Sequence, residues 1–384
     1  MPHAESYTEF TPELYPPFPS SPDFPTIDLQ TISLKKIQDH DAAEQDRMFD
    51  ACKNWGFFYL ELPESEQGRV IKEGADDVCR VAEKVFQLPL EEKMEYRPTG
   101  KQLWGWVSVN IRACVIWDEG LIDDVYIYRY KMTGQTQVDK NRTPDTAEFF
   151  NVAKNEMIIP DKDMTRKWPK PVMDNKQLFA KYSTTAHSIG LQILDVLARK
   201  LGIDPEEIHS RHRLEEMAGD HVRMTRGPPR KSIEMPEIQT PSHTDFGTIT
   251  ILMNWLGGLQ VYGSPNHILG NLDFSDSSDS SWLWVKPKPN CAIVNLGDAA
   301  VKFTNGVLCS GRHRVVPSPG EQGKWPRYSV VYFVRPNDEC KLKALKGDGV
   351  PEGDVDGEDG GGEGINAQEW IFRQAERLRT GRYN

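Results

Sequence analysis

Apolar side chains recur every three or four positions through much of the first half of the chain. This spacing predicts helices over about residues 41–55, 64–87 and 172–201. Gly56 directly follows the first of these segments and Gly202 follows the third, as expected where helices end. Helices are therefore expected to dominate this half of the protein.

From about residue 221 the pattern changes to short β-branched and aromatic runs separated by Gly, Pro and Asn. These runs are residues 248–253, 258–262, 282–287, 291–296, 313–316 and 327–334. Two earlier runs, FPTIDL (24–29) and FFYLEL (57–62), have the same character. Short strands separated by turn signals are typical of an antiparallel sandwich or barrel. We therefore expect a mainly β protein with flanking helices.

The ends of the chain have their own compositions. Residues 1–24 are rich in proline and polar side chains, which predicts an extended lead-in without a core of its own. A tract rich in Gly, Asp and Glu over residues 346–364 is expected to be a mobile surface loop. Residues 365–384 are expected to form a helix that docks on the body. No internal repeat is found, which excludes a solenoid.

Composition narrows the possible functions. The chain has 384 residues, of which 38 % are hydrophobic, and can bury a sizeable core. The net charge is −11 and the basic residues are scattered, so nucleic acid is not expected as a partner. The six cysteines contain no C-x-x-C pair and are interpreted as reduced thiols. The N-terminus lacks the layout of a signal peptide, and no apolar stretch is long enough to span a membrane. A cytoplasmic protein is expected, and its acidic surface favours a monomer.

Three residues in the β-rich half predict a metal site. His243 and Asp245 are two residues apart, and in an extended chain such side chains point to the same face. His313 lies in another predicted strand of the same region and could supply a third ligand. Two histidines and one carboxylate are typical of non-haem iron(II) oxygenases, which keep coordination positions open for a co-substrate and dioxygen. Alone, the pattern also fits a surface histidine beside a turn aspartate.

A second pair of residues points to a bound carboxylate. Arg327 and Ser329 lie on a predicted strand shortly after His313, again two residues apart. A guanidinium and a hydroxyl on one face can bind a carboxylate together. An arginine exposed on an edge strand is the alternative interpretation of Arg327.

Several segments occur in an order that matches a known family. They are PTIDL, NWGFFYL, SHTDFGTITIL, GGLQV, NLGDAAVKFTNGVLCSGRHRVV and RYSVVYFVRP. Across most of its length the sequence resembles the iron(II)- and 2-oxoglutarate-dependent dioxygenases of the isopenicillin N synthase-like family. The resemblance implies a double-stranded β-helix, or jelly-roll, core over residues 206–345. It also implies an N-terminal region of helices and strands over residues 25–205, wrapped around that core.

The resemblance also implies roles for the residues named above. His243, Asp245 and His313 would hold iron(II), while Arg327 and Ser329 would hold the distal carboxylate of 2-oxoglutarate. The implied reaction uses dioxygen and oxidises a C–H bond by hydroxylation, desaturation or ring formation, with ascorbate as a reductant in vitro. The substrate would be a small-molecule metabolite, with secondary metabolism as the expected setting.

One position departs from the family pattern. The family commonly has a tyrosine ahead of the prolines that precede the metal site, and this chain has Gly227 there. That tyrosine usually assists the co-substrate carboxylate. Either Arg327 and Ser329 suffice, or Thr225, Arg226 or a water takes over, or the co-substrate sits differently.

Candidates for the substrate site come from aromatic residues. They are Trp104, Trp106, Tyr126, Tyr128 and Phe246, with Arg226 as a polar candidate. Aromatic walls are usual for organic ligands, yet aromatics at a spacing of two are also common in half-buried strands.

Two other functions remain open from the sequence. An oxidase of the isopenicillin N synthase type would use no 2-oxoglutarate, and its equivalents of Arg327 and Ser329 would grip the substrate itself. A non-catalytic jelly-roll protein could instead hold a structural zinc ion, which usually needs four protein ligands. Cys309, four residues before His313, is then a candidate for the fourth.

Overall fold

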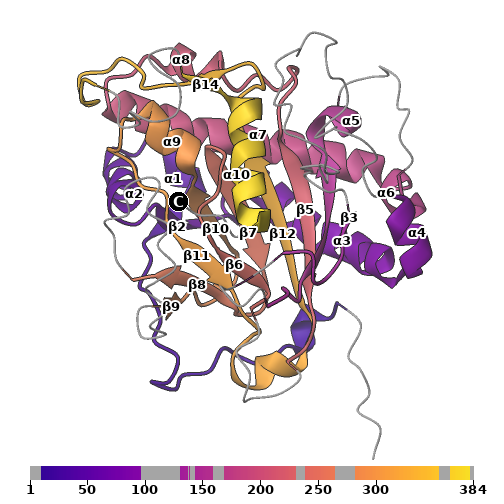
Figure 1. Cartoon of the computed structure of the whole chain (residues 1–384). Helices are drawn as coiled ribbons and strands as arrows, with labels where there is room; N and C mark the ends of the chain where they lie inside the picture. The colour runs from indigo at the N-terminus through magenta and orange to yellow at the C-terminus, as the bar shows by residue number, and fades with distance from the viewer. Residues whose placement is uncertain are drawn as a thin grey trace, which may run out of the picture.

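The computed structural model describes residues 10–96, 130–136, 138, 143–158, 168–230, 238–263, 282–353 and 364–380. Most of its strands form two facing sheets (Figure 1). The large sheet has the order β1 (Thr31–Ser33), β2 (Phe57–Glu61), β10 (Cys291–Leu296), β7 (Ile249–Asn254), β12 (Arg327–Val334), β5 (His221–Gly227), β4 (Glu148–Ala153) and β3 (Tyr130–Lys131). The small sheet has the order β6 (Thr240–His243), β11 (His313–Val315), β8 (Leu259–Tyr262) and β9 (Trp282–Trp284). A short pair joins β13 (Lys341–Leu342) to β14 (Ile365–Asn366).

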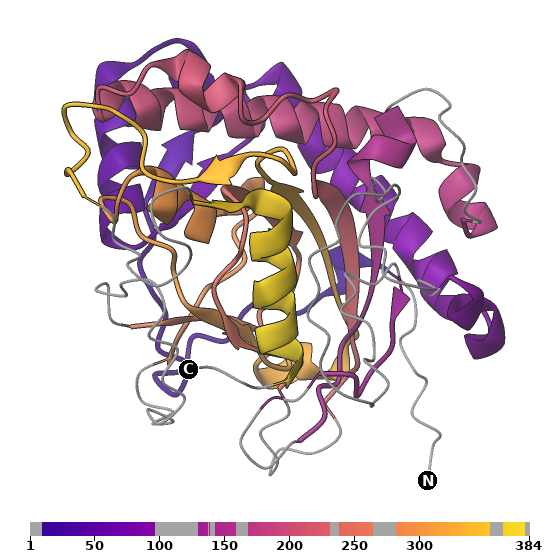
Figure 2. The same cartoon turned by 45° about the horizontal axis from the view of Figure 1, so that its top comes forward.

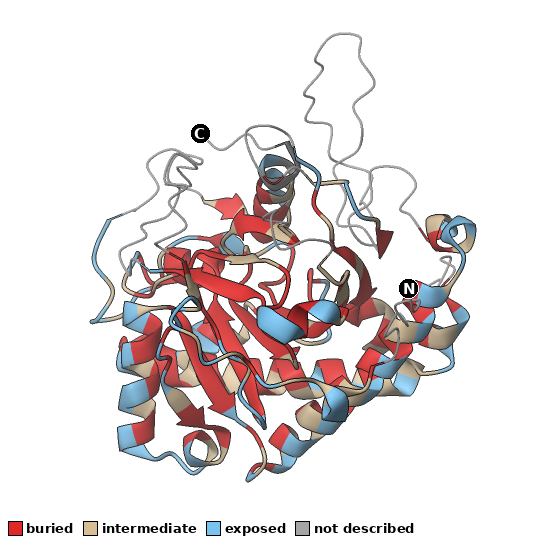
Figure 3. Cartoon of the chain, turned by 90° about the horizontal axis from the view of Figure 1, so that it is seen from below, coloured by how far each residue is buried: buried red, intermediate tan, exposed pale blue. Residues whose placement is uncertain are grey.

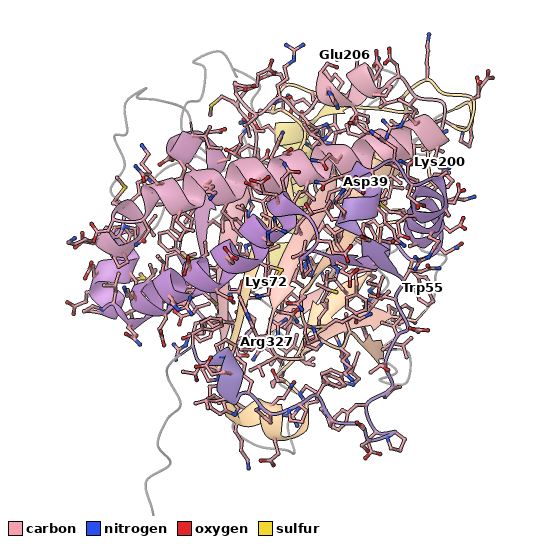
Figure 4. The ribbon with its side chains drawn as sticks, turned by 180° about the vertical axis from the view of Figure 1, so that it is seen from behind. Asp39, Trp55, Lys72, Lys200, Glu206 and Arg327 are labelled. Atoms are coloured by element: carbon pink, nitrogen blue, oxygen red, sulfur yellow. The ribbon has the colours of Figure 1, made fainter. Side chains whose placement is uncertain are left out.

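Helices cover one face of the large sheet, which we call its outer face. The α-helices in the described residues are α1 (Leu34–Gln38), α2 (Ala42–Asn54), α3 (Glu66–Gln87), α4 (Leu90–Glu95), α5 (Lys154–Ile158), α6 (Lys170–Met173), α7 (Lys176–Lys200), α8 (Pro205–His209), α9 (Asp298–Phe303) and α10 (Ala367–Thr380). Seen from behind, α3 and α7 lie across the sheet (Figure 4). Seen from the front, α10 lies on the opposite side of the large sheet (Figures 1 and 2). No helix in the described part of the chain is long and apolar enough to cross a membrane.

Strand alternation divides the core into two clusters. On β12, Val330, Tyr332 and Val334 face the helices and join the main cluster. The opposite side of the large sheet, which we call its inner face, contributes Leu252 and Ile293 to a smaller cluster against the small sheet. Seen from below, the strands are buried while the helices keep exposed outer sides (Figure 3). The inner face is therefore where a site can form between the sheets.

The predicted helices are present, and local signals explain where they begin and end. The side chain of Asp41 accepts a hydrogen bond from Glu44 N at 2.9 Å at the start of α2. The predicted helix over 172–201 forms as α6 and α7, which are separated around Asn175. Gly202 adopts a φ of 66° after α7, a conformation that glycine adopts without strain.

The first strand is not where the sequence predicts it. Within FPTIDL only Thr26 pairs, in an isolated parallel bridge to Trp284, and the first strand of the sheet is β1. Proline has no backbone N–H group, so Pro25 cannot donate a hydrogen bond to a neighbouring strand. Its carbonyl accepts one from Trp284 N at 2.8 Å, and the ladder is not extended there. The apolar residues Ile27 and Leu29 are nevertheless buried, which explains their pattern.

Two segments expected to be loose lie against the body. The described part of the lead-in includes the short 3-10 helix η1 (Pro12–Leu14). Just before it, the buried Phe10 ring contacts Trp255 at 4.6 Å between centroids. The first part of the Gly-rich tract contacts the end of α7, since Gly349 N donates to Leu201 O at 2.9 Å. Glycine lets the two backbones approach this closely. Residues 354–363 of the tract lie outside the described residues.

Close packing between α7 and β12 gives a test of this fold. A Cβ atom at Gly190 would lie 2.7 Å from Val334 Cγ2. We expect Gly190→Ala to lower the free energy of unfolding by about 1–3 kcal/mol because the core is overpacked. In a Val334→Ala background the same change should cost much less, as alanine favours a helix. Urea denaturation of the four proteins measures this, and equal costs in both backgrounds would contradict the proposed contact.

Candidate metal centre

The three predicted ligands lie together at one edge of the small sheet. His243 ends β6 and pairs directly with His313, which begins β11. Their ring centroids are 4.3 Å apart, and Asp245 follows β6 by two residues. One ligand atom from each residue lies within 4.8 Å of the other two. The pairing of two short strands therefore assembles a possible metal site.

Backbone carbonyls orient both imidazoles. His243 Nδ1 lies 2.8 Å from Pro241 O, and His313 Nδ1 lies 3.0 Å from Gly311 O. A carbonyl can only accept, so each Nδ1 carries a proton and Nε2 is the nitrogen of each ring that can bind a metal. The two Nε2 atoms lie 3.7 Å and 3.9 Å from Asp245 Oδ1. This donor set fits a divalent cation with open coordination positions.

Hydrogen bonds leave one oxygen of Asp245 facing the histidines. Its Oδ2 accepts from Thr250 Oγ1 and from Asn295 Nδ2, both at 2.6 Å. Burial raises the pKa of Asp245, but the two histidines and these hydrogen bonds outweigh it and hold the pKa below its usual value. Burial, and then the nearby His313, lower the pKa of His243 to about 4. The site is therefore kept as one carboxylate and a neutral His243, the forms that bind metal.

Arg327, Ser329 and Thr225 meet on the inner face of the large sheet. Alternation on β12 places Arg327 and Ser329 on the face opposite Val330, and Ser329 pairs with Thr225 of β5. Arg327 is 2 % exposed, and its Nε donates to Gly257 O at 2.8 Å. Burial lowers its pKa to about 10, so it stays charged at neutral pH. Figure 4 shows Arg327 in the lower half of the molecule, well away from Glu206 of α8 at the top.

The structure does not bring every candidate to this face. Arg226 lies one residue from Thr225 and so points to the outer face, where its Nη1 donates to Glu148 Oε1 at 3.0 Å. Phe246 is partly buried and packs against the main hydrophobic cluster. The remaining aromatic candidates lie outside the described residues: Trp104, Trp106, Tyr126 and Tyr128.

Gln239 occupies the space beside Gly227 and was not identified from the sequence. A Cβ atom at Gly227 would lie 2.1 Å from Gln239 Oε1, and Gln239 is 2 % exposed. Its Nε2 donates to Pro228 O at 3.2 Å. Gly227 pairs with Arg327 across the two strands, so this amide lies near the end of the inner face that carries Arg327. In the sequence, the only sign of this was that Gly227 stands where the family commonly has a tyrosine, which leaves room for another side chain.

A closed zinc site finds no support in the described part of the chain. No cysteine joins the group formed by His243, Asp245 and His313. Cys309 instead directs its thiol to Lys53 O at 2.6 Å, at the end of α2. Structural zinc sites usually have four protein ligands, so this arrangement favours an open site.

Comparison with known proteins agrees with this geometry. Residues 219–336 match the 2OG-Fe(II) oxygenase superfamily, and residues 24–113 match the N-terminal domain described as non-haem dioxygenase in morphine synthesis. A 2-oxoglutarate-dependent dioxygenase of Aspergillus fumigatus is 30% identical over 341 residues, which cover 87% of this chain and 82% of the relative. The chain belongs to the 2-oxoglutarate- and iron(II)-dependent oxygenases. It is therefore an oxidoreductase whose cofactors are iron(II) and 2-oxoglutarate.

Two further similarities concern a relative and a solved structure. A protein of Ocimum basilicum named oxoglutarate-dependent flavonoid 7-O-demethylase 1 is 27% identical over 326 residues, which cover 84% of this chain and 72% of the relative. The crystal structure of a full-length Neurospora crassa protein in complex with alpha-KG superposes with a TM-score of 0.65 at 22% identity, covering 91% of this chain and 96% of that one. The predicted jelly-roll fold of this oxygenase is confirmed by the structural similarity.

The hydrogen bonds on Asp245 predict how tightly this oxygenase binds metal. We expect Asn295→Ala to weaken iron(II) binding about 10–100-fold, because Asp245 loses a group that orients it. Anaerobic competition with a chelating dye measures the change. Asn155→Ala is a matched control, since Asn155 is buried on α5 and donates to Ala218 O at 3.1 Å. Equal iron affinity in both variants would refute the orienting role of Asn295.

The contact at Gly227 predicts a coupling with Gln239. We expect Gly227→Ala to lower the free energy of unfolding by about 1–3 kcal/mol, since the buried amide must move. The cost should fall when Gln239 is first changed to Ala. Denaturation of both single variants and the double variant measures the coupling, and additive effects would show that the two positions do not touch.

Proposed function

We propose that His243, Asp245 and His313 hold the iron(II) of this oxygenase. We further propose that Arg327, Ser329 and Thr225 bind the distal carboxylate of 2-oxoglutarate. Two observations carry the proposal: a two-histidine, one-carboxylate group lies at the edge of the small sheet, and a buried arginine lies on the inner face of the large sheet. The donor atoms suit iron(II), and a buried guanidinium suits a carboxylate that must be held in one orientation.

The residues of the chain would bind, orient and exclude water. The iron, when bound with 2-oxoglutarate and dioxygen, supplies the oxidising chemistry. Gly257 O holds the Arg327 side chain by its Nε, which leaves the terminal nitrogens to meet the co-substrate. The hydroxyls of Ser329 and Thr225 lie on directly paired residues and can add hydrogen bonds. Since these groups are fixed before the co-substrate binds, little reorganisation is needed at the moment of reaction.

The substrate is proposed to be a small-molecule metabolite, oxidised at a C–H bond in secondary metabolism. The name of the Ocimum basilicum relative supports this class, because it describes a reaction on a flavonoid. The names of the Aspergillus fumigatus and Ocimum basilicum relatives both include dependence on oxoglutarate, which disfavours an oxidase that uses no 2-oxoglutarate. We expect the enzyme to act as a monomer.

Co-substrate turnover tests the assignment. The purified protein, with iron(II), ascorbate and 2-oxoglutarate under air, is expected to form succinate. His243→Ala, Asp245→Ala and His313→Ala should each lose nearly all of this activity, because the metal loses a ligand. His209→Ala is the matched control, since His209 lies on α8 and contacts Asp195 at 2.7 Å.

A spectroscopic measurement checks the co-substrate independently of turnover. Anaerobic iron(II) protein titrated with 2-oxoglutarate should develop a visible metal-to-ligand charge-transfer band. Arg327→Met should require a much higher 2-oxoglutarate concentration to reach half of the band, because the distal carboxylate loses its cation. Full succinate formation by Asp245→Ala, or no band in the unaltered protein, would refute the proposal.

A further inference from the structure

Two arginines near the metal centre, the partly buried Arg223 and the buried Arg335, form no ion pair with a carboxylate in the described part of the chain. We propose that Arg223 and Arg335 form a second anion site and that the substrate carries a carboxylate that binds there. This inference rests on the proposed function, since it names the substrate class of the same site. It assigns to these arginines the task of orienting the substrate.

Arg335 is a buried cation whose donors are unused. It follows β12 directly and is 4 % exposed. Its Nε and Nη1 are fully buried without a hydrogen-bond partner, and no ion pair is found for it among the described residues. Burying a guanidinium without partners is costly, so an unpaired one suggests a ligand.

Two glycines make room for this side chain next to the metal centre. A Cβ atom at Gly247, two residues after Asp245, would lie 2.9 Å from Arg335 Cγ. A Cβ atom at Gly219 would lie 3.1 Å from Arg335 Nη1. The arginine is therefore wedged between the loop that follows Asp245 and the residues that lead into β5.

Arg223 approaches from the inner face of β5. Its Nε donates to Asn151 Oδ1 at 2.8 Å, and its guanidinium lies 4.0 Å from the centre of the Phe149 ring. Phe333 lies close to both arginines, with its ring centre 5.1 Å from Arg223 Cζ and 5.5 Å from Arg335 Cζ. Two like charges around one ring repel each other, and a bound anion would relieve that repulsion.

The second site is separate from the end of the sheet that carries Arg327. Phe333 pairs with Thr250, whose hydroxyl holds Asp245, so this group lies at the level of the metal. Arg327 lies six residues earlier, at the start of β12. The proposed co-substrate and the substrate carboxylate would thus be bound by different arginines.

Helix α10 closes this region from the other side. It lies on the inner side of the large sheet, opposite α3 and α7 (Figure 2). Ile371 of α10 reaches the same place as Arg335, since its Cδ1 lies 3.5 Å from the Cβ position of Gly219. Gln374, one turn further on, is buried and has no hydrogen-bond partner for its Nε2. This amide adds another unused donor on the side of the helix that carries Ile371.

The chemistry of these groups favours a carboxylate. Guanidinium groups bind carboxylates through two parallel hydrogen bonds, and that geometry fixes orientation as well as position. A substrate held in this way would present one C–H bond to the iron repeatedly. The alternative is that Arg335 only balances Asp220, Asp245 and Asp338, which attract it from beyond ion-pair distance.

A set of small carboxylates and their matched primary amides tests the proposal. Each is titrated anaerobically into protein loaded with iron(II) and 2-oxoglutarate, with the shift of the charge-transfer band as the readout. 4-Phenylbutyrate and 4-phenylbutyramide are one such pair. Among the carboxylates that bind, we expect each to have an affinity about tenfold higher than that of its matched amide. Arg335→Met and Arg223→Gln should abolish this preference, and Arg335→Lys should keep part of it.

The controls separate this inference from the proposed function. Arg213→Met should keep the preference, since Arg213 is exposed and pairs with Glu216 at 3.3 Å. The band must form with 2-oxoglutarate alone in the unaltered protein, and its absence would refute the co-substrate assignment instead. No preference for any carboxylate in the unaltered protein would overturn the anion site. So would an undiminished preference in Arg223→Gln, which decides the matter if Arg335→Met does not fold.

Discussion

The antiparallel pairing of β6 with β11 is the constraint on which the rest of the site depends. These strands are only four and three residues long, yet their register places His243 directly opposite His313. A slip by one residue would turn one imidazole to the other face of the sheet. The carbonyls of Pro241 and Gly311 then fix both rings, and Thr250 and Asn295 fix Asp245 from the large sheet. The metal centre therefore requires both sheets in register.

The inner face of the large sheet is divided between packing and chemistry. Where the small sheet covers it, Leu252, Ile293 and Phe57 fill the space with apolar side chains. Over β12 and β5 the same face carries Arg327, Ser329, Thr225 and Arg223 instead. Polar residues on an inward face cost stability unless they have partners. Their concentration on these two strands is the strongest sign that this part of the interior serves ligands and not the core.

Sequence patterns predicted most of the fold and part of the site, for identifiable reasons. Helices with a 3.6-residue repeat, such as α3 and α7, depend on local spacing and were found. The grouping of His243, Asp245 and His313 was also predicted, and the structure brings the three together although Asp245 lies just beyond β6. Thr225 and Arg226 were equally plausible from the sequence, and only the observed register shows that Arg226 faces Glu148. Gln239 and Arg335 could not be assigned, since what they touch comes from distant segments and carries no local signal.

The order of the strands in the large sheet has a consequence for how the protein is made. β2 pairs with β10, whose first residue, Cys291, comes 230 positions after Glu61, the last of β2 (291 − 61 = 230). At about 5–20 residues per second, a ribosome needs roughly 10–50 seconds to supply that partner. During this interval the nascent chain exposes an apolar strand edge, the kind of surface that chaperones bind and that promotes aggregation. Yield in a foreign host should therefore depend on chaperone capacity and growth temperature more strongly than on the stability of the finished enzyme.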